Sequence, residues 1–281
     1  MSGVPDRPTL FPSTAELESI AISVAHEAVS IVVRGFGHAS TIRTKSSATD
    51  VVTQTDIDSE NRIRELLEVA TPGCGIIGEE GGISGIDRRL QWIIDPLDGT
   101  VNFLYGLPVF AVSIAAAVDG EFVAGAVVDG LRKDTYSGCL GGGARCNGVA
   151  IAPSRCDVLA SALVTTGFSY TPRLRALQAS IVAGLLPVAR DIRCFGSAAL
   201  QLCWAASGRV DAYFERDIKI WDWAAGALIA SEAGLDVDLP CPENDGLVLA
   251  SPAALSKELR ALTYSGRPPH PPFAPEALST A

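Results

Sequence analysis

Four short clusters of acidic residues hold the side chains of this sequence that could do chemistry together. They lie at 50–56, 78–81, 92–100 and 221–226. In the third cluster, Asp95 and Asp98 are three residues apart across a Pro-Leu turn and can point toward one place, with the Leu97 carbonyl oxygen between them. Carboxylates gathered in a crevice repel one another and lose hydration. Such a cluster is tolerable when hard divalent cations neutralise it, and Mg²⁺ takes oxygen ligands of this kind.

Each cluster also has a structural explanation when it is taken alone. Asp-Pro-Leu-Asp-Gly is good turn chemistry, Gly-Glu-Glu-Gly is typical of a solvated loop, and Asp222 can cap a helix. Other kinds of active site have less support. His26, His38 and His270 are widely separated, and the sequence contains neither a Gly-x-Ser-x-Gly elbow nor a P-loop.

The elements that must position these acids follow from the spacing of apolar residues. A capping box at 13–16 and helical spacing predict a helix that runs to Gly35, and a second helix covers about 56–70. Apolar runs at 75–77 and 92–94 predict strands that lead into Glu79 and Asp95, and 109–118 with 121–129 predict a hairpin. Beyond residue 155, predicted strands (163–166, 191–194, 210–214, 247–250) alternate with predicted helices (174–186, 197–206, 222–233, 252–263).

This order of elements predicts a layered α/β protein in two halves. We expect a flexible arm at 1–12 and an α+β half at 13–154 that holds most of the acids. An α/β half follows at 155–264 and contributes Asp222, and a Pro-rich tail occupies 265–281.

Composition narrows the range of partners. The chain has 281 residues, and its 22 Lys+Arg against 32 Asp+Glu give a formal net charge of -10, which disfavours nucleic-acid binding. No apolar run reaches the roughly 20 residues that a bilayer requires, and the start lacks a secretory signal, so we expect a cytoplasmic protein without a membrane partner. The seven cysteines include no Cys-x-x-Cys pair and are expected to be buried thiols in a reducing compartment.

Two clusters resemble the signatures of the inositol monophosphatase family. They read Trp-Ile-Ile-Asp-Pro-Leu-Asp-Gly-Thr-Val-Asn-Phe at 92–103 and Trp-Asp-Trp-Ala-Ala-Gly at 221–226, and the resemblance extends from about residue 13 to 263. It implies a Mg²⁺-dependent, lithium-sensitive phosphatase of the fructose-1,6-bisphosphatase-like superfamily. It also implies a layered α/β/α/β/α sandwich of the sugar-phosphatase type and a homodimer.

The resemblance assigns metal ligands for two to three Mg²⁺ ions per site. The first ion takes Glu79, Asp95 and the Leu97 carbonyl, and the second takes Asp95, Asp98 and Asp222. Glu79, with water, helps to hold a weaker third ion.

The remaining roles also come from the resemblance. Thr100, with Asp56 or Glu79, orients the attacking water, and these three residues form the expected catalytic set. The other assignments cover contacts with the phosphate (Gly99, Thr100), contacts with the alcohol portion of the substrate (Asp98, Ser197, Ala198, Glu215) and support of the site (Lys45, Asp50).

The expected reaction is hydrolysis of myo-inositol monophosphate, a small phosphorylated substrate. Glu215, seven residues before Asp222, favours a polyol because a carboxylate accepts hydrogen bonds from ring hydroxyls. Histidinol phosphate, fructose 1,6-bisphosphate and 3'-phosphoadenosine 5'-phosphate stay open as substrates for the same chemistry, and a protein-binding regulatory role is the alternative of another class. Arg216, Asp217 and Lys219 are expected to be surface charges rather than parts of the leaving-group pocket.

Overall fold

The computed structural model describes residues 11–38, 41–44, 51–244 and 246–264. Residues 1–10 of the predicted arm, the predicted tail at 265–281 and the predicted supporting residues Lys45 and Asp50 lie outside the described residues. Among the helices that the structure describes, none is both long enough and apolar enough to cross a bilayer.

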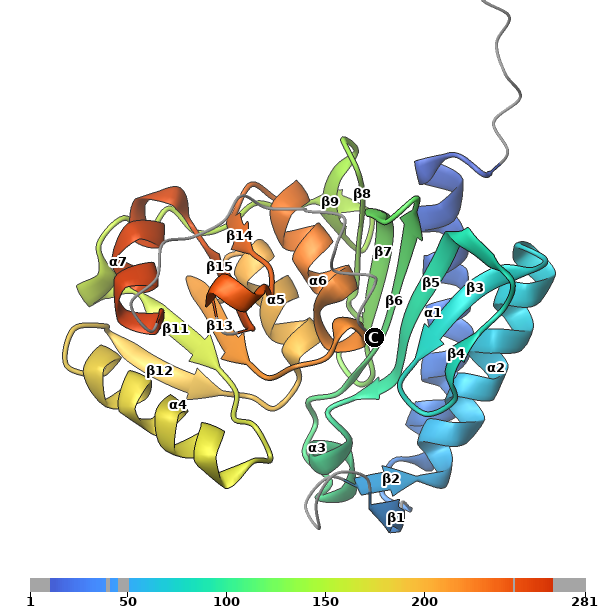
Figure 1. Ribbon diagram of the computed structural model, residues 1–281, viewed down its shortest axis with the longest axis horizontal. Helices are drawn as coiled ribbons and strands as arrows, with labels where there is room; N and C mark the ends of the chain where they lie inside the picture. The colour runs from blue at the N-terminus through green and yellow to red at the C-terminus, as the bar shows by residue number, and fades with distance from the viewer. Residues whose placement is uncertain (1–10, 39–40, 45–50, 245, 265–281) are drawn as a thin grey trace, which may run out of the picture.

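The first half is built on an eight-stranded sheet with the strand order β10-β9-β8-β7-β6-β5-β3-β4. Its strands are β3 (Cys74–Gly78), β4 (Gly82–Ser84), β5 (Asp87–Asp98), β6 (Ala111–Val118), β7 (Glu121–Asp129), β8 (Thr135–Cys139), β9 (Gly143–Cys146) and β10 (Val149–Ala150). β3 and β5 run parallel, and the other neighbouring strands are antiparallel. α1 (Thr14–Gly35) and α2 (Gln54–Ala70) pack together on one face, beside the hairpin of β1 (Thr41–Thr44) and β2 (Val51–Thr53) (Figure 1).

The second half holds a five-stranded sheet with the order β12-β11-β13-β15-β14. Its strands are β11 (Leu163–Thr166), β12 (Asp191–Cys194), β13 (Ala212–Arg216), β14 (Asp236–Asp238) and β15 (Leu247–Ser251). α5 (Ala198–Ala206) and α6 (Ile220–Glu232) lie between the two sheets, and α4 (Pro172–Leu185) and α7 (Ala253–Thr263) cover the outer face. The predicted α/β/α/β/α sandwich is therefore confirmed (Figure 1).

The alternation of side chains along β5 explains why its sequence is apolar throughout. Trp92 and Ile94 pack in the core shared with α1 and α2, whereas Ile93 packs in the core shared with α5 and α6. Because residues two apart on a strand share a face, Asp95 lies on the same face as Ile93. The strand thus delivers Asp95 to the side of the sheet that α6 covers.

Three sequence expectations differ from the structure. Asp95 and Asp98 do not flank a turn: β5 continues through Pro96 to Asp98, and its pairing with β6 shifts register between the two acids. Of the cysteines expected to be buried, Cys74, Cys139 and Cys203 are buried, Cys146, Cys156 and Cys241 are half-buried, and Cys194 is exposed because it ends β12, an edge strand. Arg216 is buried rather than at the surface, where its guanidinium donates to the carbonyls of Asn244 and Thr263.

Candidate active site

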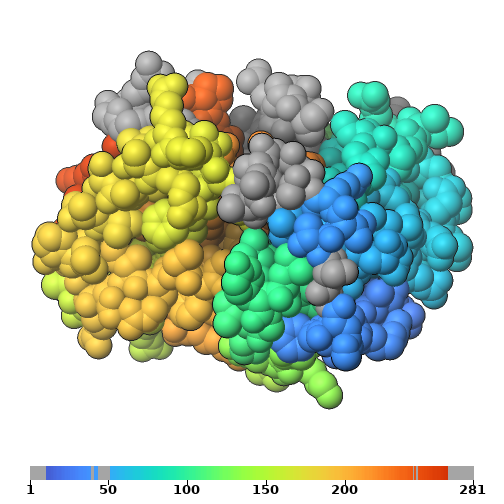
Figure 2. Space-filling view, turned by 90° about the horizontal axis from the view of Figure 1, so that it is seen from below, coloured from blue at the N-terminus to red at the C-terminus, as the bar shows by residue number. Residues whose placement is uncertain are grey.

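The predicted acids meet where the two halves of the molecule join. Asp95 and Asp98 end β5, Glu79 follows β3, and Asp222 lies in the first turn of α6. Figure 2 shows the face on which the green segment that contains α3 (Thr100–Leu104) lies against the orange segments of the second half. The structure therefore brings residues from three separate parts of the sequence to the seam where the two halves join.

Asp95 is at the centre of this group. Its side chain is 2% exposed, and Oδ1 accepts a hydrogen bond of 2.9 Å from the Leu97 N–H. Burial raises its pKa well above the usual range, and the charges of Glu79, Asp98 and Asp222 raise it further. Carboxylates whose charges raise the pKa of Asp95 in this way lie near its side chain.

Asp98 joins the two halves directly. Its Oδ2 accepts hydrogen bonds from the Ser197 hydroxyl at 2.5 Å and the Ala199 N–H at 2.8 Å, and its Oδ1 accepts one from the Ala198 N–H at 3.2 Å. A carboxylate at a helix start is stabilised by free N–H groups and by the helix dipole. Burial still dominates and raises the pKa of Asp98 to about 6, although these hydrogen bonds oppose the rise.

Asp222 has the capping role that sequence reasoning offered as its structural explanation, and it also faces the other acids. Its Oδ2 accepts a 2.6 Å hydrogen bond from the Lys219 N–H at the start of α6. Desolvation raises its pKa well above the usual range, and the charges of Glu79 and Asp98 add to the rise. A capping role and a place among the acids are therefore compatible.

Asp56 and Thr100 form a hydrogen-bonded pair. The Thr100 hydroxyl lies 3.0 Å from Asp56 Oδ1 and 3.0 Å from the Leu97 carbonyl oxygen. Asp56 is fully buried at the start of α2, where the Thr53 N–H donates to its Oδ2 at 2.9 Å, and burial raises its pKa. Thr100 is half-buried, so it is the more exposed residue of the pair.

The loop that carries Glu79 is held by a residue that the sequence did not single out. Glu60, 2% exposed on α2, accepts hydrogen bonds of 2.7 Å from the N–H groups of Glu80 and Gly81. Arg64, one helical turn later, pairs with Glu60 and donates to the Gly82 carbonyl. In the sequence, the four-residue spacing of Glu60 and Arg64 on one predicted helix is the pattern that could have pointed to this pair.

A second unpredicted contact fixes α3. Gly99, which precedes this helix, has φ of +96°, a conformation that suits glycine, and a side chain there would clash with the Val109 carbonyl. Asn102 donates from its amide to the carbonyls of Val109 at 2.8 Å and Phe195 at 2.6 Å. These contacts tie the start of α3 to the loop before α5.

The predicted contacts with the substrate alcohol lie next to Asp98. Ser197 is fully buried, and its hydroxyl is engaged with Asp98, while Ala198 is 7% exposed at the start of α5. Glu215 is 9% exposed on β13, and the Tyr213 hydroxyl donates to it. Burial raises the pKa of Glu215 to about 8, and the charge of Asp98 contributes to the rise.

The candidate site has the oxygen ligands that a hard cation prefers, but the described side chains are not arranged around one ion. Buried carboxylates that raise one another's pKa, together with a main-chain carbonyl oxygen, form a donor set that a divalent cation would relieve. Among the residues that the structure describes, however, no three His, Cys, Asp or Glu side chains are close enough together to hold one ion. The division of ligands between ions therefore stays a prediction.

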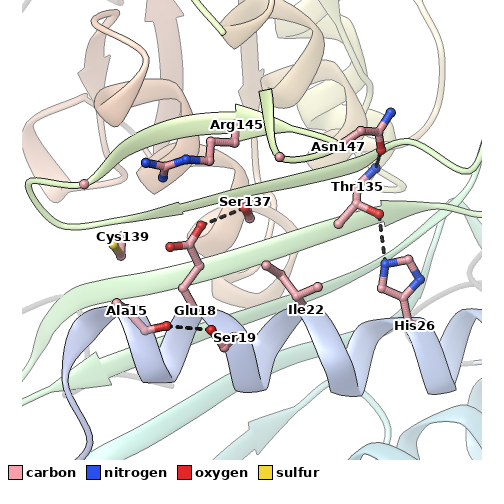
Figure 3. Close-up of a pocket in the computed structure, with 12 residues that line it drawn as sticks. Ala15, Glu18, Ser19, Ile22, His26, Thr135, Ser137, Cys139, Arg145 and Asn147 are labelled. Carbon is pink, nitrogen blue, oxygen red and sulfur yellow. Dashed lines mark hydrogen bonds between the residues drawn. The ribbon is translucent and has the colours of Figure 1, made fainter. Parts of the chain in front are cut away.

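A separate hollow of about 600 Å³ lies between α1 and the strands β8 and β9 (Figure 3). Its walls carry Glu18, which accepts from Ser137, and His26, which lies 3.0 Å from the Thr135 hydroxyl. Arg145 projects from β9. None of the predicted site residues lines this hollow.

Comparison with known proteins agrees with the geometry. The model of the inositol monophosphatase family matches residues 13–265. "Inositol-1-monophosphatase SuhB" of Mycobacterium tuberculosis is 43% identical, over 92% of this chain and 97% of its own. "Nus factor SuhB" of Pasteurella multocida is 39% identical, over 87% of this chain and 94% of its own.

A solved structure supports the same assignment. The extragenic suppressor protein suhB of Bartonella henselae superimposes with a TM-score of 0.82 at 31% identity, over 88% of this chain and 98% of its own. The chain belongs to the inositol monophosphatase family, whose members are phosphatases that generally depend on a metal ion.

Proposed function

We propose that this protein is a Mg²⁺-dependent phosphomonoesterase that hydrolyses myo-inositol monophosphate to inositol and phosphate. The observation that carries the proposal is the group of mutually repelling carboxylates beside the Asp56–Thr100 pair. Relatives that are 43% identical to this chain are named inositol-1-monophosphatase, which supports the choice of substrate. Inhibition by lithium, a homodimer and a cytoplasmic location belong to the same proposal.

Glu79, Asp95, Asp98, Asp222 and the Leu97 carbonyl oxygen would hold two to three Mg²⁺ ions. Bound Mg²⁺ supplies charge neutralisation for the phosphate and lowers the pKa of a coordinated water. The protein contributes the arrangement of its acids: Asp98 and Asp222 are fixed at helix starts, and the Glu79 loop is fixed by Glu60.

Thr100 would orient the attacking water, and Asp56 would hold Thr100. Asp56 cannot reach solvent itself because it is fully buried, but it accepts from the Thr100 hydroxyl. When that hydroxyl donates to Asp56, its oxygen lone pairs can accept a hydrogen bond from the water and so orient it. The hydrogen bond between Thr100 and Asp56 supports Asp56 as the partner of Thr100, where the sequence left Asp56 and Glu79 open.

The ends of the substrate would be recognised by different halves of the molecule. Gly99 and Thr100, at the start of α3, present backbone N–H groups that lack intrahelical acceptors and suit a phosphate. The inositol ring would contact Asp98, at the end of β5, and three residues of the second half that lie near it: Ser197, Ala198 and Glu215.

A phosphate-release assay tests the proposal. Wild-type protein with Mg²⁺ is compared on inositol 1-phosphate, histidinol phosphate, fructose 1,6-bisphosphate and 3'-phosphoadenosine 5'-phosphate. We expect the highest kcat/KM with inositol 1-phosphate, loss of activity in EDTA, and a fall of at least about 100-fold in Asp95→Asn. Asp119→Asn, at an exposed turn position with φ of +51° that Asn adopts readily, is the matched control. Full activity of Asp95→Asn, or equal activity in EDTA, contradicts the mechanism. A higher kcat/KM with one of the other three compounds makes that compound the proposed substrate.

A regulatory binding role is the second candidate. It is favoured by relatives named "Nus factor SuhB", one of which is 39% identical to this chain. Pull-down of the transcription machinery by wild-type and Asp95→Asn protein separates the two roles. Capture that persists in Asp95→Asn while phosphate release is lost supports a binding role independent of catalysis. Capture by neither protein contradicts it.

A further inference from the structure

Glu215 is held in place by two neighbours that the proposed chemistry does not use. The Tyr213 hydroxyl donates to Glu215 Oε2 at 2.9 Å. Within the described part of the chain, Glu215 Oε1 accepts no hydrogen bond. One oxygen is therefore engaged by the protein, and the other keeps its capacity to accept a hydrogen bond.

Gly167 provides the space in which this carboxyl group lies. A methyl group at position 167 would be 2.1 Å from Glu215 Oε1 and 2.3 Å from Oε2, so the carboxyl group fills the place of a side chain. Gly167 does not have a positive φ. A side chain at this position would therefore displace the Glu215 carboxyl group, whereas the backbone conformation itself does not call for glycine.

The strand ends that carry these residues are clamped together by Gln178 of α4, which is 3% exposed. Its amide donates to the carbonyls of Gly167 at 3.5 Å and Arg216 at 3.4 Å, and its oxygen accepts from the Ser169 N–H at 2.9 Å. The end of β11 and the end of β13 are thereby kept at a fixed separation, which sets the position of the Glu215 carboxyl group.

Tyr213 faces the acids rather than only the core. Its side chain is fully buried, and the charges of Glu215, Asp98 and Asp222 add to the effect of burial in raising its pKa. Tyr136, an equally buried tyrosine on β8, receives no such contribution from these carboxylates. Tyr213 is therefore adjacent to the site, and Tyr136 is a matched control.

We propose that Tyr213 and Gly167 are positioning residues that aim Glu215 Oε1 at a ring hydroxyl of the substrate, and so set the preference for polyol phosphates. This inference rests on the proposed phosphatase function. It adds to that function the two residues that position Glu215.

The test is the ratio of kcat/KM for inositol 1-phosphate to kcat/KM for 4-nitrophenyl phosphate, whose leaving group has no further hydroxyl. Loss of one hydrogen bond to a carboxylate costs about tenfold, so we expect Tyr213→Phe to lower the ratio about tenfold, mainly through KM for the inositol ester. Gly167→Ala should lower it at least as much because the carboxyl group must move away. Tyr136→Phe and Gly184→Ala, a helix position with open space, should keep the wild-type ratio.

A double-mutant cycle distinguishes positioning from a general loss of structure. If both residues act through Glu215, each substitution in a Glu215→Ala background should leave the ratio of that background unchanged. Variants that keep the wild-type ratio, or that lower it equally in both backgrounds, overturn the inference and leave the proposed function intact. Wild-type protein that hydrolyses 4-nitrophenyl phosphate but not inositol 1-phosphate overturns the proposed function and the inference with it.

Discussion

At the scale of single residues, the candidate site depends on how its acids tolerate one another. Asp56, Asp98 and Asp222 each accept a backbone N–H at the start of a helix, namely α2, α5 and α6. These charge-assisted hydrogen bonds and the helix dipoles offset part of the cost of desolvation. They do not remove it, since the pKa of each of the three is raised. The remaining cost is the one that bound cations would relieve.

Thr100 is the residue whose chemistry can be tested most directly. Thr100→Val keeps the shape of the side chain but removes the hydroxyl that donates to buried Asp56. We therefore expect kcat for phosphate release to fall at least about 100-fold. Thr100→Ser retains the hydroxyl and should stay within about tenfold of wild type. Circular dichroism shows whether both variants are folded. A Val variant with wild-type kcat would exclude Thr100 from water orientation.

At the scale of elements, α2 supports the site from behind. Glu60 accepts from the N–H groups of Glu80 and Gly81 with different oxygens, and it thereby fixes the loop between β3 and β4 that carries Glu79. A side chain at Gly78 would lie 2.6 Å from Glu60 Oε1, so the helix and the loop pack without room for one. The position of a predicted metal ligand thus depends on an element that contributes no ligand there.

Glu60→Gln tests this support. The amide has only one acceptor oxygen, so one of the two loop N–H groups loses its partner and the loop loosens. Because such outer contacts are worth 10- to 100-fold in metal affinity, we expect the Mg²⁺ concentration for half-maximal phosphate release to rise by about tenfold or more. Activity should recover at high Mg²⁺. Glu65→Gln, an exposed position on the same helix, is the control, and an unchanged Mg²⁺ requirement in Glu60→Gln would show that the loop needs no such support.

At the scale of the whole molecule, two sheets and their helices meet at a seam that concentrates negative charge. The formal net charge of -10 disfavours contact with nucleic acid, yet part of it lies on the acids of the seam. Each half contributes carboxylates, so neither half contains a complete candidate site. Cations at the seam would favour both phosphate binding and association of the halves.

The seam predicts how stability depends on pH. In the metal-free protein, the folded-state pKa values of Asp98, about 6, and Glu215, about 8, exceed their ordinary values. The folded state therefore binds more protons than the unfolded state between about pH 4 and pH 8, and its stability falls as pH rises through that range. Mg²⁺ held by Asp98 would displace the proton of Asp98 and recover the part of the loss that Asp98 causes.

Thermal unfolding with Mg²⁺ or with EDTA, at pH 5.5 and pH 8, measures this effect. We expect the Mg²⁺-dependent gain in Tm to be about 5 °C greater at pH 8, corresponding to about 2–3 kcal/mol at roughly 2 °C per kcal/mol. An equal gain at both pH values would contradict the assignment of Asp98 to a cation site. A metal-free Tm that is higher at pH 8 than at pH 5.5 would contradict the raised pKa values of Asp98 and Glu215.

Local patterns in the sequence determined most of the elements. The capping box at Ser13 and Glu16 begins α1 as predicted, and the Asp119-Gly120 turn joins β6 to β7. Helical and strand spacing also placed α4 to α7 and β11 to β15 within a few residues, apart from the short β14. These features depend on contacts within a few residues, which is why sequence reasoning finds them.

The sequence alone also determined which acids could form the site, because their residue types and their two signatures are local properties of the chain. Only the tertiary structure decided that Asp98 binds the start of α5, that Thr100 pairs with Asp56 and that Glu60 holds the Glu79 loop. Each of these contacts joins residues that are 20 to 101 positions apart, and no periodicity reports such a distance. The same holds for Gly167, where the space for a side chain is occupied by the carboxyl group of Glu215 on β13.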